Sequence, residues 1–446
     1  MHPEDKISPA FEPYLADSRR RDKHEAVVIY QAPETKPAGP DRLRDVSGRL
    51  RQAEAQATRH REIESRIFDD YRESSDEALR ISPIGHSALP VITVEVTPRT
   101  LLSLARQPDV IAIMPNQKIH LIKPQAVSFD ELARSEARQG YTWGLEQLGV
   151  APVWDKTQGA GVKVGVLDTG VFGDHPALDK RVSDFVIIDP LGRRIAAKPT
   201  FDAGAHGTHV CGTIAGGQTP EGVHIGVAPE ANLLVAAVLV GDATLRTLLE
   251  GLDWAIEKGA DIVNMSLGFN YYEPMFTEVF DVLINQYGVL PVVAVGNENQ
   301  GNSSSPGNAY NALAVGALER HSRARVDVAF FSSGASLVFP GQEPNALVTK
   351  PDVAAPGVQV YSTIPPTLRV DGAYYYSYMD GTSMAAPHVA GVAALLMAAQ
   401  PKAPVAEIVR VLKETAAHPG GANRRPDNRW GHGMVRPEEA LAALTS

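Results

Sequence analysis

From about Thr142 to the C-terminus, short apolar runs alternate with amphipathic helices, and no other feature of the chain constrains the fold as much. The runs have the length of β-strands and are apolar at nearly every position, which is typical of strands covered on both faces. Strands that alternate with helices form a parallel sheet between helical layers. We therefore expect an α/β fold with three layers (αβα) and a mostly parallel sheet. The runs read VKVGVLD, NLLVAAVLV, DIVNMS, VLPVVAV and NALAVGAL.

Residues 26–123 show a different, α+β pattern. A long helix is predicted from Asp41 to Tyr71, and its apolar positions recur at three- and four-residue steps. This stripe favours a helix packed on its own sheet over a coiled coil that binds a partner. A second, short helix is predicted in PRTLLSLARQP, where prolines lie near both ends. The strand-like runs are AVVIY, LPVITVEV, DVIAIMP and KIHLI.

Two polar segments flank this smaller unit. Residues 1–25 contain mixed charges and prolines, and we expect a flexible polar arm there. Residues 124–141 are polar without a strong pattern, and we expect a linker that is open to cutting. The predicted division is therefore an arm (1–25), a small domain (26–123), a linker (124–141) and a large domain (142–446).

Composition excludes several classes of partner. The net charge is −10 and no dense block of Lys and Arg occurs, which argues against nucleic acid or an acidic membrane surface. Cys211 is the only cysteine, so no intrachain disulfide is possible and an oxidising compartment is not required. The N-terminus lacks the apolar core of a signal peptide, and no stretch reaches transmembrane length. The expected location is the cytoplasm, unless an unconventional route exports the chain.

Polar residues stand where three of the apolar runs end. Asp168 ends the first run, Ser266 ends the third, and Asn297 follows the fourth. Any one of these could simply begin a loop, because Asp, Asn and Ser are favoured in turns. In a parallel sheet, however, the carboxyl ends of the strands meet at the edge where ligands bind. Three such groups on one edge therefore indicate a site.

Two further segments supply a base and a nucleophile. His206 in AHGTHVCGTIAGG and Ser383 in DGTSMAAPHVAG each precede small residues, which suggests helices held close to the sheet. A zinc site at His206 and His209 lacks the accompanying carboxylate or cysteine pattern. Together with Asp168, these residues make an acid–base–nucleophile set in the chain order Asp, His, Ser.

The chemistry requires each member of this set. A serine hydroxyl is a poor nucleophile at neutral pH, so a neutral imidazole must take its proton during attack. A buried carboxylate must hold that imidazole in the right tautomer and stabilise its charged form. The oxyanion needs donors, and the backbone N–H of Ser383 at a helix start and the side-chain amide of Asn297 are available.

The region from about Thr142 onward resembles the subtilisin family of serine proteases, the subtilases. The resemblance implies a subtilisin-like fold with Ser383 as nucleophile, His206 as base, Asp168 as its orienting carboxylate and Asn297 as oxyanion donor. The matching stretches occur in family order: VGVLDTGVFGDHPAL, HGTHVCGTIAGG, IGVAPEANLLVAAVL, IVNMSLG, VVAVGNENQG, KPDVAAPGVQVYST and DGTSMAAPHVAGVAALL. The family's substrate-binding strands would lie at Ser266, Leu267 and Gly268 and near Val240 and Gly241.

The N-terminal unit resembles, more weakly, the small α+β, ferredoxin-like prodomain of the same family. Such a prodomain assists folding, and its C-terminal tail lies in the active site as an inhibitor. By position the tail is IHLIK, so we expect self-cleavage near Ile122–Lys123. The small, uncharged Ala294, Val295 and Gly296 are expected to line the pocket for the side chain before the cut. An apolar or aromatic side chain is the expected preference there.

The expected chemistry needs no cofactor. Members of the family commonly bind structural calcium, but the matching carboxylate position is Ala177, which puts the usual site in doubt. Asp174, Asp179 and Glu221 could supply oxygen ligands of another kind.

The sequence thus predicts a serine endopeptidase made as a zymogen, with protein or peptide substrates and its own prodomain as intramolecular inhibitor. The alternative is a latent or partner-activated protease whose retained N-terminal domain is a regulatory or binding module. An esterase of the α/β-hydrolase type is excluded, because that fold needs Gly-x-Ser-x-Gly and the order Ser, Asp, His.

Overall fold

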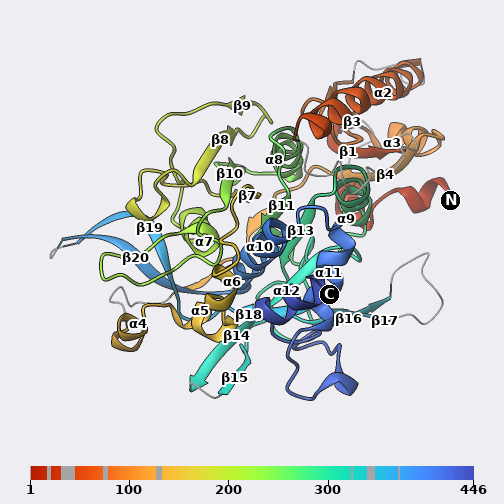
Figure 1. Ribbon diagram of the computed structural model, residues 1–446. Helices are drawn as coiled ribbons and strands as arrows, with labels where there is room; N and C mark the ends of the chain where they lie inside the picture. The colour runs from red at the N-terminus through yellow and green to blue at the C-terminus, as the bar shows by residue number, and fades with distance from the viewer. Residues whose placement is uncertain are drawn as a thin grey trace.

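The computed structural model describes residues 2–17, 22–31, 46–73, 79–126, 133–322, 325–338, 347–369 and 372–445. The predicted helix start at Asp41 and part of the predicted linker, residues 127–132, lie outside these ranges. A large C-terminal α/β unit carries a smaller N-terminal unit against the side formed by helices α8 (Leu245–Glu257) and α9 (Phe276–Asp281) (Figure 1).

Within the described residues, a nine-stranded sheet forms the centre of the large unit. Its strand order is β15-β14-β13-β11-β7-β10-β8-β9, with β18 beside β14. Only the β14–β15 and β8–β9 pairs are antiparallel, so the predicted mostly parallel sheet is confirmed. The strands are β7 (Lys163–Asp168), β8 (Val182–Ile188), β9 (Arg194–Ile195), β10 (Asn232–Ala237), β11 (Ile262–Met265), β13 (Leu290–Ala294), β14 (Leu313–Ser322), β15 (Arg325–Val328) and β18 (Val353–Pro356).

Helices cover both faces of this sheet, which explains why its strands are apolar at consecutive positions. Val166 belongs to the core beneath α7 and α10, whereas the next residue, Leu167, packs into the core beneath α8 and α9. The three-layer arrangement is therefore confirmed. The face that bears Val166 is covered by α7 (His206–Ala215), α10 (Thr382–Ala399), α11 (Val405–Glu414) and α12 (Pro437–Thr445). The short helices α5 (Trp143–Leu148) and α6 (Ala151–Trp154) lie at the margin of this face.

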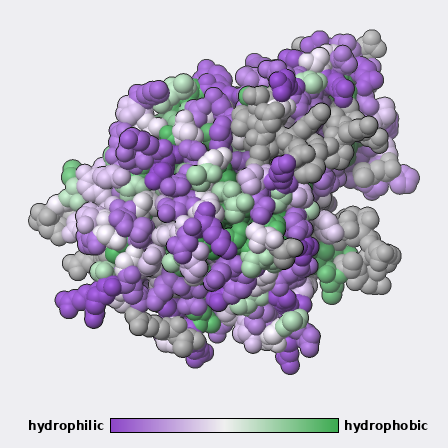
Figure 2. Space-filling model, viewed as in Figure 1, coloured by the Kyte–Doolittle hydropathy of each residue, from purple (hydrophilic) through white to green (hydrophobic). Residues whose placement is uncertain are grey.

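Helix α10 is long and apolar enough to cross a membrane, and it is the one such helix in the described ranges. Most of it is buried beneath the rest of the large unit, as expected for a core helix. The surface in Figure 2 is largely hydrophilic, with apolar residues in small groups.

In the described residues, the N-terminal unit contains an antiparallel sheet of order β2-β3-β1-β4 on which helices α2 and α3 pack. Strand β1 is buried on both sides. Its Val28 and Tyr30 pack beneath α2 and α3, whereas Val27 and Ile29 pack into the core of the large unit. The elements are β1 (His24–Tyr30), α2 (Val46–Glu73), β2 (Ile81–Pro83), β3 (Val91–Val96), α3 (Pro98–Ala105) and β4 (Val110–Pro115).

The run KIHLI does not extend the sheet of the N-terminal unit. It contains β5 (His120–Leu121), which pairs antiparallel with β12 (Leu267–Gly268) of the large unit. The segment from Gln117 to Ala126, here called the tail, thus leaves the small unit and crosses the large one.

The expected flexible arm over residues 1–25 is wrong for the described residues 2–17. Phe11 is buried in the core of the N-terminal unit, and Ser8 N donates to Ile113 O of β4 at 2.9 Å. A Ser-Pro start, with Ala10 N donating to Ser8 Oγ at 3.2 Å, forms a short 3-10 helix that holds Phe11 in place. The elements are η1 (Pro3–Lys6), η2 (Pro9–Phe11) and α1 (Glu12–Asp17), and β1 begins at His24, within the predicted arm.

A buried carboxylate on α8 anchors the N-terminal unit. Asp253 is fully buried, and its oxygens accept hydrogen bonds from the backbone N–H groups of His86, Ala88 and Leu89 at 2.8–3.1 Å. Arg194 supplies the compensating charge, with Nη2 at 2.6 Å from Asp253 Oδ2. Three backbone donors and one guanidinium satisfy a charge that would otherwise be costly to bury.

A second carboxylate lies one turn along the same helix. Glu257 Oε2 contacts Arg194 Nη1 at 2.7 Å, and its Oε1 lies 3.0 Å from His86 Nδ1 of the N-terminal unit. Burial, together with the charge of Asp253, raises the pKa of Glu257 to about 7. The contact between the two units therefore favours the protonated form of Glu257.

This raised pKa predicts that the assembled chain loses stability as pH increases. The contribution of Glu257 is greatest below its ordinary pKa of 4.5 and is lost as pH rises through about 7. In a Ser383→Ala background, which removes the predicted nucleophile, Glu257→Gln should raise the melting temperature at pH 8 relative to the parent by about 2–4 °C. The two should differ less at pH 5. Glu62→Gln, at an exposed glutamate of α2, is the control, and an equal gain of Glu257→Gln at both pH values contradicts the prediction.

Candidate active site

The three strand-end residues lie on one edge of the sheet. Asp168 ends β7, Ser266 follows β11, and Asn297 follows β13. Met265 of β11 pairs with Leu167 of β7 on one side and with Val293 of β13 on the other. The carboxyl ends of these three strands are therefore adjacent. The sequence predicted this juxtaposition, and the structure brings the residues together.

His206 is the first residue of α7, and the glycine after it lets the helix approach the sheet. A Cβ atom on Gly207 would lie 2.1 Å from the carbonyl oxygen of Gly170, in the loop after β7. Only glycine fits that approach. The helix therefore presents the imidazole of His206 directly to the end of β7.

Asp168 and His206 form a buried pair. His206 Nδ1 lies 2.8 Å from Asp168 Oδ1 and 3.0 Å from Oδ2, and the two side chains are 4 % and 0 % exposed. An ionised carboxylate only accepts hydrogen bonds, so Nδ1 carries the ring proton and Nε2 keeps a free lone pair. That tautomer can take a proton from a nucleophile.

Ser383 and Asn297 meet at the start of α10. Ser383 is the second residue of this helix, where backbone N–H groups lack intrahelical partners. Asn297 Oδ1 accepts hydrogen bonds from Thr382 N and Thr382 Oγ1 at 3.0 and 2.9 Å, which leaves its Nδ2 as a donor toward the cleft. Ser266 Oγ donates to the carbonyl oxygen of Ser383 at 3.4 Å.

The tail of the N-terminal unit occupies this cleft. Ile122 N donates to Ser266 O at 3.1 Å, continuing the β5–β12 ladder. Ser383 Oγ donates to Ile122 O at 2.9 Å, and Asn297 Nδ2 donates to Lys123 O at 3.0 Å. The predicted cleavage residues therefore lie against the predicted nucleophile and oxyanion donor.

The serine and the asparagine engage two successive carbonyl groups. During acyl transfer the nucleophile attacks the same carbonyl whose oxygen the oxyanion donor binds. Here Ser383 contacts the carbonyl of Ile122, whereas Asn297 contacts that of Lys123. Meanwhile the buried Nε2 of His206 has no hydrogen-bond partner in the described part of the chain.

Beyond Pro124 the tail joins a second strand. Gln125 and Ala126 form β6, which pairs antiparallel with the end of β20 (Gly372–Asp380). β20 pairs with β19 (Val360–Arg369) in a hairpin that leads directly to Ser383. The tail is thus held by backbone hydrogen bonds on both sides of the Ile122–Lys123 bond.

The opposite wall of the cleft lies further along the chain than predicted. The tail contacts Ala243 and Thr244, through Ile119 N to Ala243 O at 3.2 Å and an antiparallel bridge from Lys118 to Thr244. Val240 and Gly241 precede this contact. The turn in which Ala243 N donates to Gly241 O at 3.0 Å displaces the binding segment toward the start of α8. Thr244, which directly precedes α8, is the feature of the sequence from which this contact could have been predicted.

The predicted pocket residues are buried at the end of β13. Ala294, Val295 and Gly296 are all shielded from solvent, and Gly296 has φ +115°. A Cβ atom on Gly296 would meet Glu298 Oε2 at 2.4 Å, so glycine is required there. The sequence reasoning missed Glu298, whose Oε2 accepts from Ser304 Oγ at 2.8 Å beside this turn.

The residues at the family's usual calcium position do not fit that ion. Ala177 presents a methyl group where a carboxylate would be needed, and its carbonyl oxygen accepts a hydrogen bond from Gly217 N at 2.8 Å. Among the described residues, no three His, Cys, Asp or Glu side chains cluster as metal ligands.

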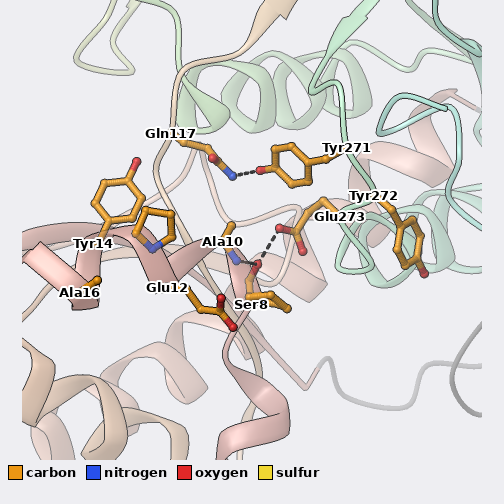
Figure 3. Close-up of a pocket in the computed structure, with 11 residues that line it drawn as sticks. Ser8, Ala10, Glu12, Tyr14, Ala16, Gln117, Tyr271, Tyr272 and Glu273 are labelled. Carbon is orange, nitrogen blue, oxygen red and sulfur yellow. Dashed lines mark hydrogen bonds between the residues drawn. The ribbon is translucent and has the colours of Figure 1, made fainter. Parts of the chain in front are cut away.

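A cavity of about 690 Å³, which none of the predicted catalytic residues lines, lies between the N-terminal segment and the loop Tyr271–Glu273 (Figure 3). Ser8 Oγ donates to Glu273 Oε2 at 2.7 Å across it, and Gln117 of the tail donates to the hydroxyl of Tyr271. Burial raises the pKa of Glu273. The N-terminal segment and the beginning of the tail therefore both bind this loop of the large unit.

Known proteins are similar to this chain over most of its length. Residues 159–433 match the model of the subtilase family. M-protease of Shouchella clausii is 33 % identical over 375 residues, covering 82 % of this chain and 83 % of the relative. Subtilisin Savinase of Lederbergia lenta is 35 % identical over 309 residues, covering 68 % of this chain and 99 % of the relative.

Among solved structures, fervidolysin from Fervidobacterium pennivorans, described as a keratinolytic enzyme related to subtilisin, is similar with a TM-score of 0.69 and 26 % identity. The likeness covers 96 % of this chain and 62 % of fervidolysin. It therefore includes the N-terminal unit as well as the large one.

The geometry at Asn297 predicts a loss of turnover without a comparable loss of binding. Asn297→Ala removes the side-chain donor from the cleft, and loss of an oxyanion-hole asparagine in subtilisin lowers kcat by roughly 10²–10³-fold. The same loss is expected here, with KM for a peptide substrate changed much less. Asn302→Ala, at an exposed asparagine five residues further on, is the matched control. Equal kcat values for the two variants would contradict the role of Asn297.

Proposed function

The chain belongs to the subtilase family of serine proteases, and we propose that it is an endopeptidase made as a zymogen, with Ser383, His206, Asp168 and Asn297 as its catalytic residues. Residues 142–446 are its catalytic domain and residues 26–123 its inhibitory prodomain. Its substrates are proteins or peptides, which it hydrolyses through an acyl-enzyme on Ser383.

The observation that carries this proposal is the meeting of four groups at one place. The buried Asp168–His206 pair, at 2.8 Å, leaves the basic nitrogen of the ring free. Ser383 and Asn297 lie together at the start of α10 and both donate to backbone carbonyls of one bound peptide segment. A base, a hydroxyl and an amide donor around an extended backbone are the parts that acyl transfer requires.

The tail supports the inhibitory role of the N-terminal unit. It binds as a substrate would, by strand addition to β12, which gives affinity through the main chain. Ser383 contacts the carbonyl of Ile122, whereas Asn297 contacts that of Lys123. This arrangement disfavours attack, because neither carbonyl contacts both the hydroxyl and the amide donor. We infer that cutting at Ile122–Lys123 requires the tail to shift until Asn297 faces the carbonyl oxygen of Ile122.

The tail also supports a preference for apolar side chains. Ile122, which precedes the proposed cut, and Ile119, three residues earlier, are both almost fully buried in the cleft. Each packs with apolar side chains of the large unit. Substrates with apolar residues at these two places bury comparable surface.

The zymogen proposal predicts the fate of the purified chain. Intact mass should show the wild type losing residues 1–122 over time, with a new N-terminus at Lys123, whereas Ser383→Ala stays whole. The reason is that cleavage of the tail needs the chain's own hydroxyl. Ser336→Ala, at an exposed serine of β16 (Ala335–Val338), should process like the wild type.

A new N-terminus before Pro115 or after Val150 would overturn the proposed cleavage site. If the wild type also stays at full length, that result supports the alternative function. In this alternative the chain is a latent protease that awaits a partner, and the N-terminal unit is retained as a regulatory or binding module. The shared core between the two units is the observation that favours this alternative.

A further inference from the structure

We propose that Asp202, outside the catalytic set, is a positioning residue that fixes Asp168 and His206 relative to each other. The inference rests on the proposed function, because it assigns a role toward the pair in that set. Asp202 lies in the loop before α7 and contacts neither the tail nor the reacting hydroxyl in the described structure. It acts through Thr169 and through the first turn of α7.

Asp202 links the two segments that bear the catalytic pair. Its Oδ1 accepts a hydrogen bond from Thr169 Oγ1 at 2.6 Å, beside Asp168. Its Oδ2 accepts from Thr208 N at 2.8 Å and from Thr208 Oγ1 at 2.6 Å, two residues after His206. One carboxylate therefore spans the loop after β7 and the start of α7, using both of its oxygens.

The hydroxyl of Thr169 is the junction of this link. It accepts a hydrogen bond from Gly207 N at 3.0 Å, so it also contacts the residue after His206. It has one proton to donate, and Asp202 at 2.6 Å is a better acceptor than Asp168 at 3.3 Å. Thr169 N donates to Asp168 Oδ1 at 2.7 Å. Fixing Thr169 through Asp202 thus sets the position of the carboxylate that holds His206.

The charge of Asp202 serves the same pair. Helix α7 starts after Ala205, which offers no side-chain cap, and His206 occupies its first position. When the imidazole takes the proton of the nucleophile, a positive charge forms at a helix N-terminus, where the dipole disfavours it. Asp202 caps this helix through Thr208 N and brings a second negative charge to the same end. It therefore both orients the first turn and offsets that penalty.

A purely structural role makes a different prediction. If Asp202 only closed its loop, its loss would lower stability and leave the turnover of the folded enzyme unchanged. If it positions the catalytic pair, its loss lowers kcat while KM stays nearly the same, because the substrate backbone is bound by β12 and the segment near Ala243. The split between kcat and KM separates the two roles.

The test compares Asp202→Asn and Asp202→Ala with wild type after removal of residues 1–122. Trace wild-type enzyme with a removable tag completes the processing, and titration of Ser383 with a fluorophosphonate counts active molecules. We expect kcat to fall about 10²-fold for Asp202→Ala, the size that a small displacement of catalytic groups produces. Asp202→Asn keeps the shape and an acceptor oxygen, so it should fall less. KM should change by less than about threefold in both.

One control variant and one spectroscopic measurement make the outcome decisive. Asp261→Asn removes another carboxylate that binds a backbone N–H, that of Lys163 at 2.8 Å, but at the opposite edge of the sheet, and it should keep wild-type kcat. In Ser383→Ala chains, the proton NMR signal of the His206–Asp168 hydrogen bond should shift or broaden when Asp202→Asn is added. An Asp202→Asn variant that folds and keeps both wild-type kcat and this signal would overturn the proposal.

Failure of the inference is distinguishable from failure of the proposed function. If Ser383→Ala abolishes activity and the Asp202 variants keep wild-type kcat, the catalytic set stands and only the role of Asp202 falls. If Ser383→Ala itself retains activity, the catalytic assignment falls, and the inference about Asp202 falls with it.

Discussion

The hydroxyl of Ser383 can donate one hydrogen bond, and it donates that bond to the carbonyl of Ile122. The acid–base pair of Asp168 and His206 is already formed and buried, but the nitrogen that would activate the serine has no partner in the described residues. In the proposed assignment, the chain contains an organised base and an organised oxyanion donor around a nucleophile that its own tail holds. The carbonyl of Ile122, rather than any missing group, separates this state from an active one.

The tail stays in place because the two units share a core. The inward face of β1 packs directly into the layer formed by α8 and α9, so the N-terminal sheet covers apolar surface that the large unit would otherwise expose. Asp253 adds a polar anchor within that contact. The N-terminal segment joins the same assembly through Ser8 and Glu273. Cutting the tail alone leaves these contacts intact, so release of the N-terminal unit is a separate physical step.

Much of the fold and of the candidate site could be predicted from local sequence patterns. The rest depends on contacts between residues that are distant in the sequence. The apolar runs predicted the parallel sheet because both faces of each strand are covered, and the strand ends predicted Asp168, Ser266 and Asn297 on one edge. The ordered N-terminal segment was missed because Phe11 finds its core only in the folded unit. The cleft wall at Ala243 was missed because a turn before α8 sets it. Asp202 was missed because its partners at Thr169 and Thr208 meet only after α7 packs on the sheet.

In the proposed zymogen, the tail resists cutting because Ser383 and Asn297 engage successive carbonyls. Backbone pairing fixes Ile122 on one side and Gln125 on the other, with Lys123 and Pro124 between them. Deleting Pro124 shortens the span between these two fixed points by one residue and keeps the Ile122–Lys123 bond in the tail. The most direct measurement is the rate at which this deletion variant cuts itself beside the wild type. The account predicts faster cutting, with Lys123 as the new N-terminus. A variant that stays whole for as long as the wild type would contradict it.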